Sequence, residues 1–272
     1  MNFVTLKNGD SWAVSTYGSS DNELRSVLVL LHGYPLDQRL WREQVNELAG
    51  TSMVVSLDFP GFGASPASSH QCRMSDLADG VAEVLQFIGI KQPVTVCGLS
   101  MGGYVALEFW QRHRQRISGL ILADSRVVND SDEARRNRLS VAESVHQAGV
   151  EPIIASMLPK LLSQTTQRSA PDVVQKVTEM MRTATPTGIA AVQRGMAQRA
   201  DFSQRLRDID LPVLCIVGAD DPISSPAEMQ AIARELAQGQ FVAIAGAAHL
   251  PPIEQPVAFN RAIVLWRNGL MS

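Results

Sequence analysis

The sequence predicts an α/β protein with a mostly parallel, eight-stranded sheet that is flanked by helices and carries an inserted helical cap. Short apolar runs alternate with amphipathic helical patterns through residue 125 and again after residue 207. The run Ser26–Leu31 is apolar without alternation, which is typical of a strand buried on both faces. Between residues 126 and 207 the pattern is helical, and such runs are missing.

Eight apolar runs account for the predicted sheet. The first two, Phe3–Leu6 and Trp12–Tyr17, precede a turn at Gly18–Asn22. The other strands are expected at residues 26–31, 53–57, 94–97, 120–123, 213–217 and 241–244. Helices are expected at residues 38–48, 74–87, 102–113, 226–237 and 257–266. Such alternation predicts parallel pairing through right-handed crossovers, with helices on both faces of the sheet.

The break in alternation predicts the domain organisation. Residues 1–125 and 208–272 form the two parts of the core, and residues 126–207 form the cap. The cap has 12 Lys and Arg against 8 Asp and Glu, a net charge of +4, so the remainder carries −7. An insertion at the carboxyl ends of parallel strands lies over the ligand crevice of such a sheet. The alternative is a side lobe that does not contact substrate.

Composition excludes several classes of protein. Hydrophobic residues make up 45% of the 272 residues and charged residues 19%, which excludes a disordered chain. A net charge of −3 offers no basic field for nucleic acid. No apolar run approaches membrane-spanning length, and no signal peptide is visible, so no membrane partner is expected. Cys97 and Cys215 lie in apolar runs and are expected to be buried thiols, which indicates a reducing cytoplasm.

Ser100 is the candidate nucleophile. It stands in Gly98-Leu99-Ser100-Met101-Gly102, a G-x-S-x-G pattern between a predicted buried strand and a predicted helix. The glycines remove side chains that would collide in so sharp a turn. The serine hydroxyl then lies at a helix N-terminus, where free N–H groups favour developing negative charge. The alternative is a tight turn with an inert serine.

A serine nucleophile requires a base and a group that orients the base. With this motif the partners follow in the order Ser, Asp or Glu, His. Asp221 follows the strand at 213–217, third after Gly218 and directly before Pro222. It is preferred over its neighbour Asp220, which is expected to face solvent or cap a turn. His249 follows the last strand, after small residues that suit a close approach to the serine.

The other four histidines have structural interpretations. His70 lies in a polar loop, His113 at a solvated helix end and His146 in the cap, where exposure is expected. His32 ends a buried strand and is expected to be a hydrogen-bonded scaffold residue. No metal-ligand spacing is present, so no metal is expected.

The third predicted strand ends in His32-Gly33-Tyr34-Pro35, where glycine and proline force the chain out of the sheet. A second backbone N–H donor is expected at this edge. The Tyr34 amide is the candidate, paired with the amide of Met101, which follows the nucleophile. The two would form an oxyanion hole.

Together these segments closely resemble the α/β-hydrolase family over essentially the whole chain, with the cap the least similar part. Four motifs stand in family order: His32–Pro35, Asp58–Ser65, Gly98–Gly103 and the Asp221/His249 pair. The Asp58–Ser65 loop is structural in that family. The serine differs from the aspartate of haloalkane dehalogenases and epoxide hydrolases and from the cysteine of dienelactone hydrolases. The Ser-Met-Gly-Gly run and the short cap look most like the esterase and 3-oxoadipate enol-lactonase-like branch.

The resemblance implies a cofactor-free hydrolase of a small ester or lactone, with Ser100, His249 and Asp221 as its triad. Two alternatives keep this triad, namely a haloperoxidase-like perhydrolase and a carbon–carbon bond hydrolase. A third alternative is a ligand receptor on a hydrolase scaffold.

The substrate pocket is predicted from apolar residues near the cap. Leu36, Met157, Leu158 and Met181 are the candidates, with Met101, Met180 and Met196 as further ones, because methionine suits irregular apolar sites. Ordinary packing between cap and core is the alternative. The positive charge of the cap could favour an anionic ester, although Arg135, Arg136 and Arg138 are expected to form a solvated helix face.

Overall fold

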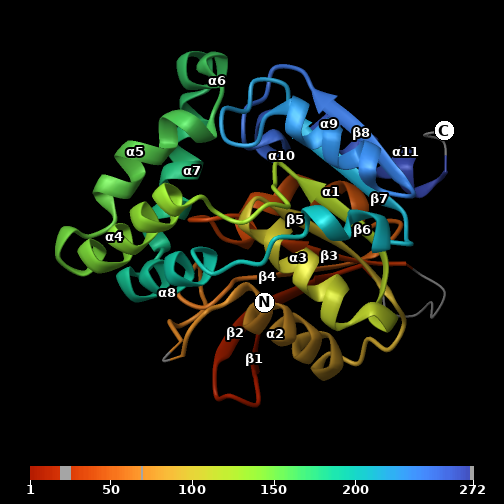
Figure 1. The fold of residues 1–272 in the computed structure, drawn as a ribbon, viewed down its shortest axis with the longest axis horizontal. Coiled ribbons are helices and arrows are strands. Elements are labelled where there is room, and N and C mark those ends of the chain that lie inside the picture. The colour runs from red at the N-terminus through yellow and green to blue at the C-terminus, as the bar shows by residue number, and fades with distance from the viewer. Residues whose placement is uncertain (19–25, 69, 270–272) are drawn as a thin grey trace.

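The computed structural model describes residues 1–18, 26–68 and 70–269. Its centre is one eight-stranded sheet in the order β1-β2-β4-β3-β5-β6-β7-β8 (Figure 1). The strands are β1 (Asn2–Thr5), β2 (Ser11–Tyr17), β3 (Val27–Leu31), β4 (Met53–Leu57), β5 (Val94–Leu99), β6 (Ile117–Ala123), β7 (Val213–Gly218) and β8 (Gly239–Ile244). Strand β2 pairs antiparallel with β1 and β4, and the other pairs are parallel. The predicted fold class is confirmed.

The strand boundaries differ from the predicted ones by a few residues. Strand β1 ends at Thr5 rather than Leu6, because the Leu6 N–H donates to the Asp10 carbonyl in a turn. Strand β6 begins three residues before Leu120, since Ile117 already pairs with Val94 of β5. Residues 19–22 of the predicted turn lie outside the described residues.

The core helices are η1 (Gln38–Trp41), α1 (Arg42–Leu48), α2 (Met74–Phe87), α3 (Met101–Arg112), η2 (Arg114–Arg116), α9 (Pro226–Glu235), α10 (Pro251–Glu254) and α11 (Pro256–Arg267). The helix predicted at residues 38–48 is present, but as two consecutive segments. A 3₁₀ turn, η1, comes first, because the Asp37 side chain accepts a hydrogen bond from the Arg39 N–H, and α1 follows it.

Helices cover both faces of the sheet. Alternate residues of β3 pack into different hydrophobic clusters, Val29 into one and Leu28 into the other. The first cluster contains buried residues of α2, α3 and α9, such as Val105. The second contains residues of α1 and α11, including Phe259. Burial on both faces explains why β3 is apolar without alternation.

A helical segment connects β6 to β7, and its helices α4 to α8 are grouped at one side of the sheet (Figure 1). It consists of α4 (Asp132–Ala148), α5 (Glu151–Leu161), α6 (Gln164–Ser169), α7 (Pro171–Thr183), α8 (Pro186–Met196) and η3 (Ser203–Asp208). The segment contacts loops at the carboxyl ends of β3 and β4. The Thr183 hydroxyl donates to Asp37 at 3.1 Å, and the Thr185 N–H donates to the Gly61 carbonyl at 2.8 Å.

Gly61 allows this approach. It has φ +84°, and a Cβ there would lie 2.4 Å from the Cα of Gly188 in α8. The rest of the Asp58–Ser65 loop is held by its own side chains. Asp58 accepts from Gln38 and Ala64, and the Ser65 hydroxyl donates to the Asp58 carbonyl at 2.7 Å.

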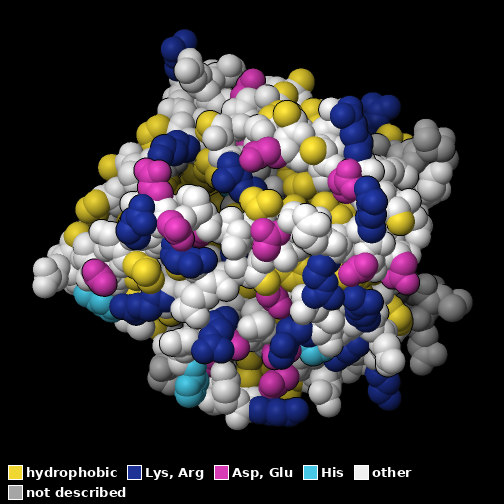
Figure 2. Space-filling view, viewed as in Figure 1, with side chains coloured by type: hydrophobic (Ala, Val, Ile, Leu, Met, Phe, Trp, Pro, Cys, Tyr) yellow, Lys and Arg dark blue, Asp and Glu magenta, His cyan; other side chains and the backbone are white. Residues whose placement is uncertain are grey.

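The surface carries charges of both signs, and the cysteines are buried. Basic and acidic side chains are intermixed on the face shown in Figure 2. In residues 1–18, 26–68 and 70–269, no helix is both long and apolar enough to cross a bilayer. Cys97 and Cys215 are buried free thiols, as predicted, and so is Cys72. Burial raises the pKa of Cys215 to about 12, which makes it a poor nucleophile.

Candidate active site

Ser100 occupies a sharp turn between β5 and α3. Its φ of 54° and ψ of −112° lie in a region that non-glycine residues rarely adopt. The Ser100 N–H donates to the Ala123 carbonyl of β6 at 2.9 Å, which fixes the turn to the sheet. A Cβ at Gly98 would lie 2.1 Å from the Gly102 carbonyl oxygen, and one at Gly102 would lie 2.3 Å from that of Leu31. Both glycines are therefore required by the backbone path.

The structure brings Asp221 and His249 together. His249 Nδ1 lies 2.8 Å from Asp221 Oδ2, and both side chains are almost fully buried. Asp221 Oδ1 also accepts the N–H of Ile223 at 2.8 Å, which orients the carboxylate. Asp220, in contrast, is exposed and donates its backbone N–H to Ala247 at 2.9 Å. Of the two acids that follow β7, Asp221 is the one that contacts the imidazole.

Ser100 and the Asp221–His249 pair follow neighbouring parts of the sheet. Strand β6 lies between β5 and β7, so the residues after these strands meet at one edge. The Ser125 hydroxyl, just after β6, donates to the Ser100 carbonyl at 2.9 Å. Among the described residues, the imidazole is hydrogen-bonded to Asp221, and the half-buried Ser100 hydroxyl makes no hydrogen bond. The serine hydroxyl is thus available, but it is not hydrogen-bonded to His249 in this structure.

Two backbone amides adjoin the serine. A Cβ at Gly33 would lie 3.3 Å from Ser100 Cβ, so the chain leaving β3 passes directly over the turn. Tyr34 follows Gly33, and Met101 opens α3. Within the described chain, neither the Tyr34 nor the Met101 N–H donates to a protein acceptor. Two unpaired N–H groups beside a hydroxyl, one of them at a helix N-terminus, suit a developing oxyanion.

Asp124 was missed by the sequence prediction. It directly follows β6, is fully buried, and has φ 45°. One carboxylate oxygen of each of Asp124 and Asp221 and one ring nitrogen of His249 lie within 4.8 Å of one another. Burial, and then the nearby Asp221, raise the pKa of Asp124 well above its ordinary value. An acid directly after a buried parallel strand was the signal in the sequence that could have identified it.

These three residues are of types that bind metals, but their atoms are already engaged. His249 Nδ1 is hydrogen-bonded to Asp221, and Oδ1 of each aspartate accepts a backbone N–H. Asp124 Oδ2 is left without a hydrogen-bond partner. Asp124 Oδ2 and His249 Nε2, the two atoms of the cluster without a hydrogen-bond partner among the described residues, fall short of the three or four protein ligands of a zinc site.

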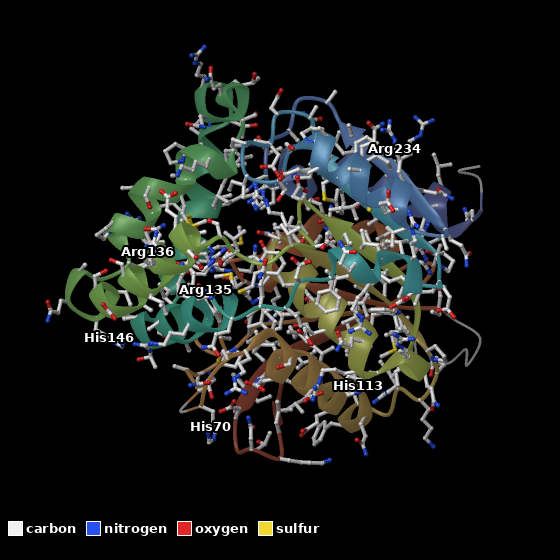
Figure 3. The ribbon with its side chains drawn as sticks, viewed as in Figure 1. His70, His113, Arg135, Arg136, His146 and Arg234 are labelled. Carbon is white, nitrogen blue, oxygen red and sulfur yellow. The ribbon has the colours of Figure 1, made fainter. Side chains whose placement is uncertain are left out.

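The other four histidines are not hydrogen-bonded to Asp221 among the described residues. His32 is buried, accepts the Phe59 N–H at Nε2, and lies 3.0 Å from the Gly33 carbonyl, so it is the predicted scaffold residue. His70 and His146 are exposed, toward the periphery of the molecule (Figure 3). His113 lies at the end of α3, as predicted, and is partly exposed, and its Nε2 lies 2.8 Å from Asp79 Oδ1 of α2.

Arg138 also differs from its prediction. Arg135 and Arg136 of α4 are exposed, as expected of a solvated face (Figure 3). Arg138 is only 22% exposed, because Asp130, in the loop before α4, lies 2.5 Å from its Nε. The same carboxylate, 5% exposed, also pairs with buried Arg199 at 2.5 Å.

Arg138 is directed toward the residue that supplies one of the amides. It donates to Gln193 Oε1 of α8 at 3.2 Å. Gln193 and Arg138 both act on the buried phenol of Tyr34, whose pKa burial raises to about 12. A guanidinium group from the helical segment therefore lies near the side chain of Tyr34, although residues 34 and 138 are far apart in the sequence.

The predicted pocket residues lie where the helical segment meets the core. Leu36 and Met181 are fully buried in one hydrophobic cluster, and Met157 and Leu158 pack against it half-buried. The cluster also contains Leu99 and Leu250, the neighbours of Ser100 and His249.

A cavity of about 960 Å³ opens between α7 and the η1–α1 segment. Of the seven pocket candidates, Met180 lines it, whereas Ser100 and His249 are not among its described lining residues. On the face shown in Figure 2, hydrophobic side chains lie inside a hollow between the α5–α7 side and the α9–α10 side.

Comparisons with known proteins agree with this architecture. A thermophilic esterase from Thermogutta terrifontis, solved with malate bound, is 38% identical over the whole of both chains, with a TM-score of 0.94. The enol-lactonase from Burkholderia xenovorans LB400 has the same fold, with a TM-score of 0.90 at 22% identity, over 98% of this chain and 100% of that one. The 3-oxoadipate enol-lactonase 2 of Acinetobacter baylyi is 27% identical over 92% of this chain and 90% of its own.

These relatives include both activities of the branch that the motifs resemble. The model of the alpha/beta hydrolase family matches residues 28–262, which is most of the chain. The chain belongs to the alpha/beta hydrolase family.

Proposed function

We propose that this protein is a serine hydrolase that cleaves a small carboxylic ester or lactone through an acyl-enzyme intermediate. The observation that carries the proposal is the buried Asp221–His249 pair, at the same sheet edge as the strained Ser100 turn. Such a hydrogen-bonded acid–imidazole pair forms at the edge where the Ser100 hydroxyl has no hydrogen-bond partner among the described residues. It is what activation of that hydroxyl requires.

The mechanism follows from the roles of these groups. Ser100 attacks the carbonyl carbon while His249 Nε2 accepts the hydroxyl proton, after a side-chain rotation that brings the two within hydrogen-bond distance. Asp221 holds the imidazole in the tautomer that carries its proton on Nδ1 and stabilises the imidazolium. The Tyr34 and Met101 amides stabilise the tetrahedral oxyanion. His249 then protonates the leaving alkoxide, and water repeats the sequence on the acyl-enzyme.

The proposal assigns residues 126–207 to a cap over the site. The contacts of Thr183 and Thr185 with loops at the carboxyl ends of β3 and β4 support it. Leu36, Met157, Leu158 and Met181 are then proposed to line the acyl side of the pocket, since they share a cluster with Leu99 and Leu250. The relatives support the chemistry, because their names are those of esterases and lactonases.

A panel of p-nitrophenyl esters and five- to seven-membered lactones, graded in chain length, tests the proposed function. We expect turnover of short members, with an initial burst of p-nitrophenol equal to the enzyme concentration if deacylation is the slower step. The acyl chain length at which activity is lost would measure the length of the pocket. Failure to hydrolyse any member of the panel would contradict the proposal.

The charge balance around Arg138 favours an anionic substrate. Two guanidinium groups, those of Arg138 and Arg199, share the single carboxylate of Asp130, which leaves one positive charge uncompensated among these three groups. Arg138 is the more exposed of the two and lies beside Gln193 and Tyr34. A carboxylate on the substrate could pair with it. The Thermogutta esterase was solved with malate, a dicarboxylate, bound, which supports binding of an anion.

The substitution Arg138→Gln tests this preference. The variant is expected to lower kcat/KM for a carboxylate-bearing ester by about 10- to 100-fold, the range for losing one hydrogen bond to a charged group. For the matched neutral ester kcat/KM is expected to change little, because Arg199 still neutralises Asp130. Arg136→Gln, at an exposed position of the same helix, is the control. An equal loss for both esters, or no salt-sensitive preference for the anion in the unmodified enzyme, would contradict the assignment.

A further inference from the structure

The buried carboxyl of Asp124 has a role that the proposed mechanism does not use. Its side chain is fully shielded from solvent, and its backbone has one of the two positive φ values among the described non-glycine residues. The other belongs to Ser100. Burying a carboxyl group and holding it in such a conformation both cost free energy, and strained residues of this kind cluster at functional sites.

Three hydrogen bonds fix Asp124 between β6 and β7. Its N–H donates to the Ile216 carbonyl at 2.9 Å, and its carbonyl accepts from the Ser224 hydroxyl at 3.0 Å. On the side chain, Oδ1 accepts the Gly218 N–H at 2.8 Å. The second oxygen, Oδ2, is buried and has no hydrogen-bond partner. The side chain is therefore held in place with one oxygen free, and a carboxylate oxygen of this group lies within 4.8 Å of Asp221 and His249.

The charged neighbours of Asp124 argue against two ionised carboxylates. Asp221 is the nearest acid, and Glu254 of α10 adds a further negative charge, while Cys97 of β5 faces it as a buried thiol. His249 is the one basic group of the cluster, and it is already hydrogen-bonded to Asp221. Two carboxyl groups this close in a dry site cannot both ionise readily, so the charged form of Asp124 is disfavoured.

We propose that Asp124 is a positioning residue that stays protonated and donates its Oδ2–H hydrogen bond to the Asp221 carboxylate. This bond gives Oδ2 the partner that it otherwise lacks. It gives Asp221 a second anchor besides His249 and withdraws negative charge from that carboxylate. The imidazolium formed during catalysis is then stabilised less strongly than by a lone aspartate, so His249 returns its proton to the leaving group more readily. The inference rests on the proposed function for its consequence in catalysis.

Two substitutions separate this role from a purely structural one. Asn in Asp124→Asn can accept from the Gly218 N–H through Oδ1 and donate to Asp221 through Nδ2, so both bonds survive without an ionisable group. Ala in Asp124→Ala retains neither. We expect Asp124→Asn to keep kcat/KM within about threefold of the unmodified value. We also expect it to leave unmoved the midpoint of the acid limb, which is the pH at which kcat/KM falls to half as the pH is lowered. We expect Asp124→Ala to lower kcat by about 10- to 100-fold and to shift that midpoint upward.

The pH profiles also give the results that would overturn the proposal. If Asp124 were ionised, Asp124→Asn would remove a negative charge near the imidazole and shift the acid limb downward, by about one pH unit or more. A loss of kcat in Asp124→Ala with an unmoved midpoint would indicate structural support alone, and it would also contradict the proposal. Activity that survives EDTA unchanged is expected, whereas loss of activity restored by Zn²⁺ would instead assign the cluster to a metal.

Two measurements do not depend on activity. Infrared difference spectra between the unmodified protein and Asp124→Asn are expected to show a protonated-carboxyl C=O band at neutral pH that shifts in D₂O. The Tm of Asp124→Asn minus that of the unmodified protein is expected to increase from about pH 4 to pH 7. The folded state keeps a proton that the unfolded chain releases above about pH 4, so the unmodified protein loses stability as the pH rises. Absence of the band in an active esterase would overturn this inference alone, while its presence in a protein without esterase activity would overturn the proposed function alone.

Discussion

Replacing Ser100 with alanine is expected to lower kcat for ester hydrolysis by about 10⁴- to 10⁶-fold, the range found when a nucleophile of this type is removed. The oxyanion donors are main-chain amides, so they survive the substitution and account for the residual rate. The fold should be unaffected. The Ser100 hydroxyl makes no hydrogen bond within the described structure, and alanine occupies no more space. Initial rates with a chromogenic ester and the thermal midpoint of unfolding measure both effects.

Ser118→Ala is the matched control for this experiment. Ser118 lies on neighbouring strand β6, is exposed, and is remote from the carboxyl edge of the sheet. Its variant should retain full activity and an unchanged thermal midpoint. If Ser100→Ala hydrolysed esters at the rate of the control, Ser100 could not be the nucleophile.

Replacing Asp221 with asparagine is expected to lower kcat by about 10⁴-fold. The amide can offer an N–H to His249 Nδ1 where the carboxylate accepted one, which moves the imidazole proton to Nε2, the nitrogen that must accept the serine proton. The volume of the side chain is nearly unchanged. The loss of kcat therefore comes from the wrong imidazole tautomer and from the missing negative charge that stabilises the imidazolium. The substrate-binding contribution to KM should change much less than kcat.

The neighbouring acid supplies the control. Asp220 is exposed and contacts Ala247 only through its backbone N–H, so Asp220→Asn should leave kcat and KM unchanged. Equal losses in the two variants would show a general disturbance of this loop. A loss confined to Asp220→Asn would show that Asp220, and not Asp221, has the orienting role.

Much of the fold could be predicted because local pattern and tertiary environment agree. Helix α2 begins at Met74 and ends at Phe87, as the periodicity predicts, and its apolar stripe is the part that packs on the sheet. The division of residues 38–48 into two helical segments arises where a side chain competes with the regular α-helix. Asp37 caps a 3₁₀ turn there and also accepts from Thr183, a contact across 146 positions that no local pattern contains.

Some residues of the site could likewise be predicted from the sequence, and others could not. Ser100, Asp221 and His249 could be proposed from the sequence because each follows a recognisable strand and the strand ends meet at one edge. Asp124 satisfies the same criterion but has no place in the three-residue pattern, so it was overlooked. The burial of Arg138 could not be predicted by any local rule, because it depends on contacts with Asp130, in the loop before α4, and with Gln193, in another helix.

Labelling with a fluorophosphonate, followed by peptide mass analysis of the digested protein, tests the central claim most directly. The reagent phosphonylates only a serine whose hydroxyl is activated and accessible. We predict one adduct per chain, on Ser100, that forms with the unmodified protein and is lost in both Ser100→Ala and heat-unfolded samples. An adduct on any other residue, or no adduct in protein that hydrolyses esters, would contradict the account.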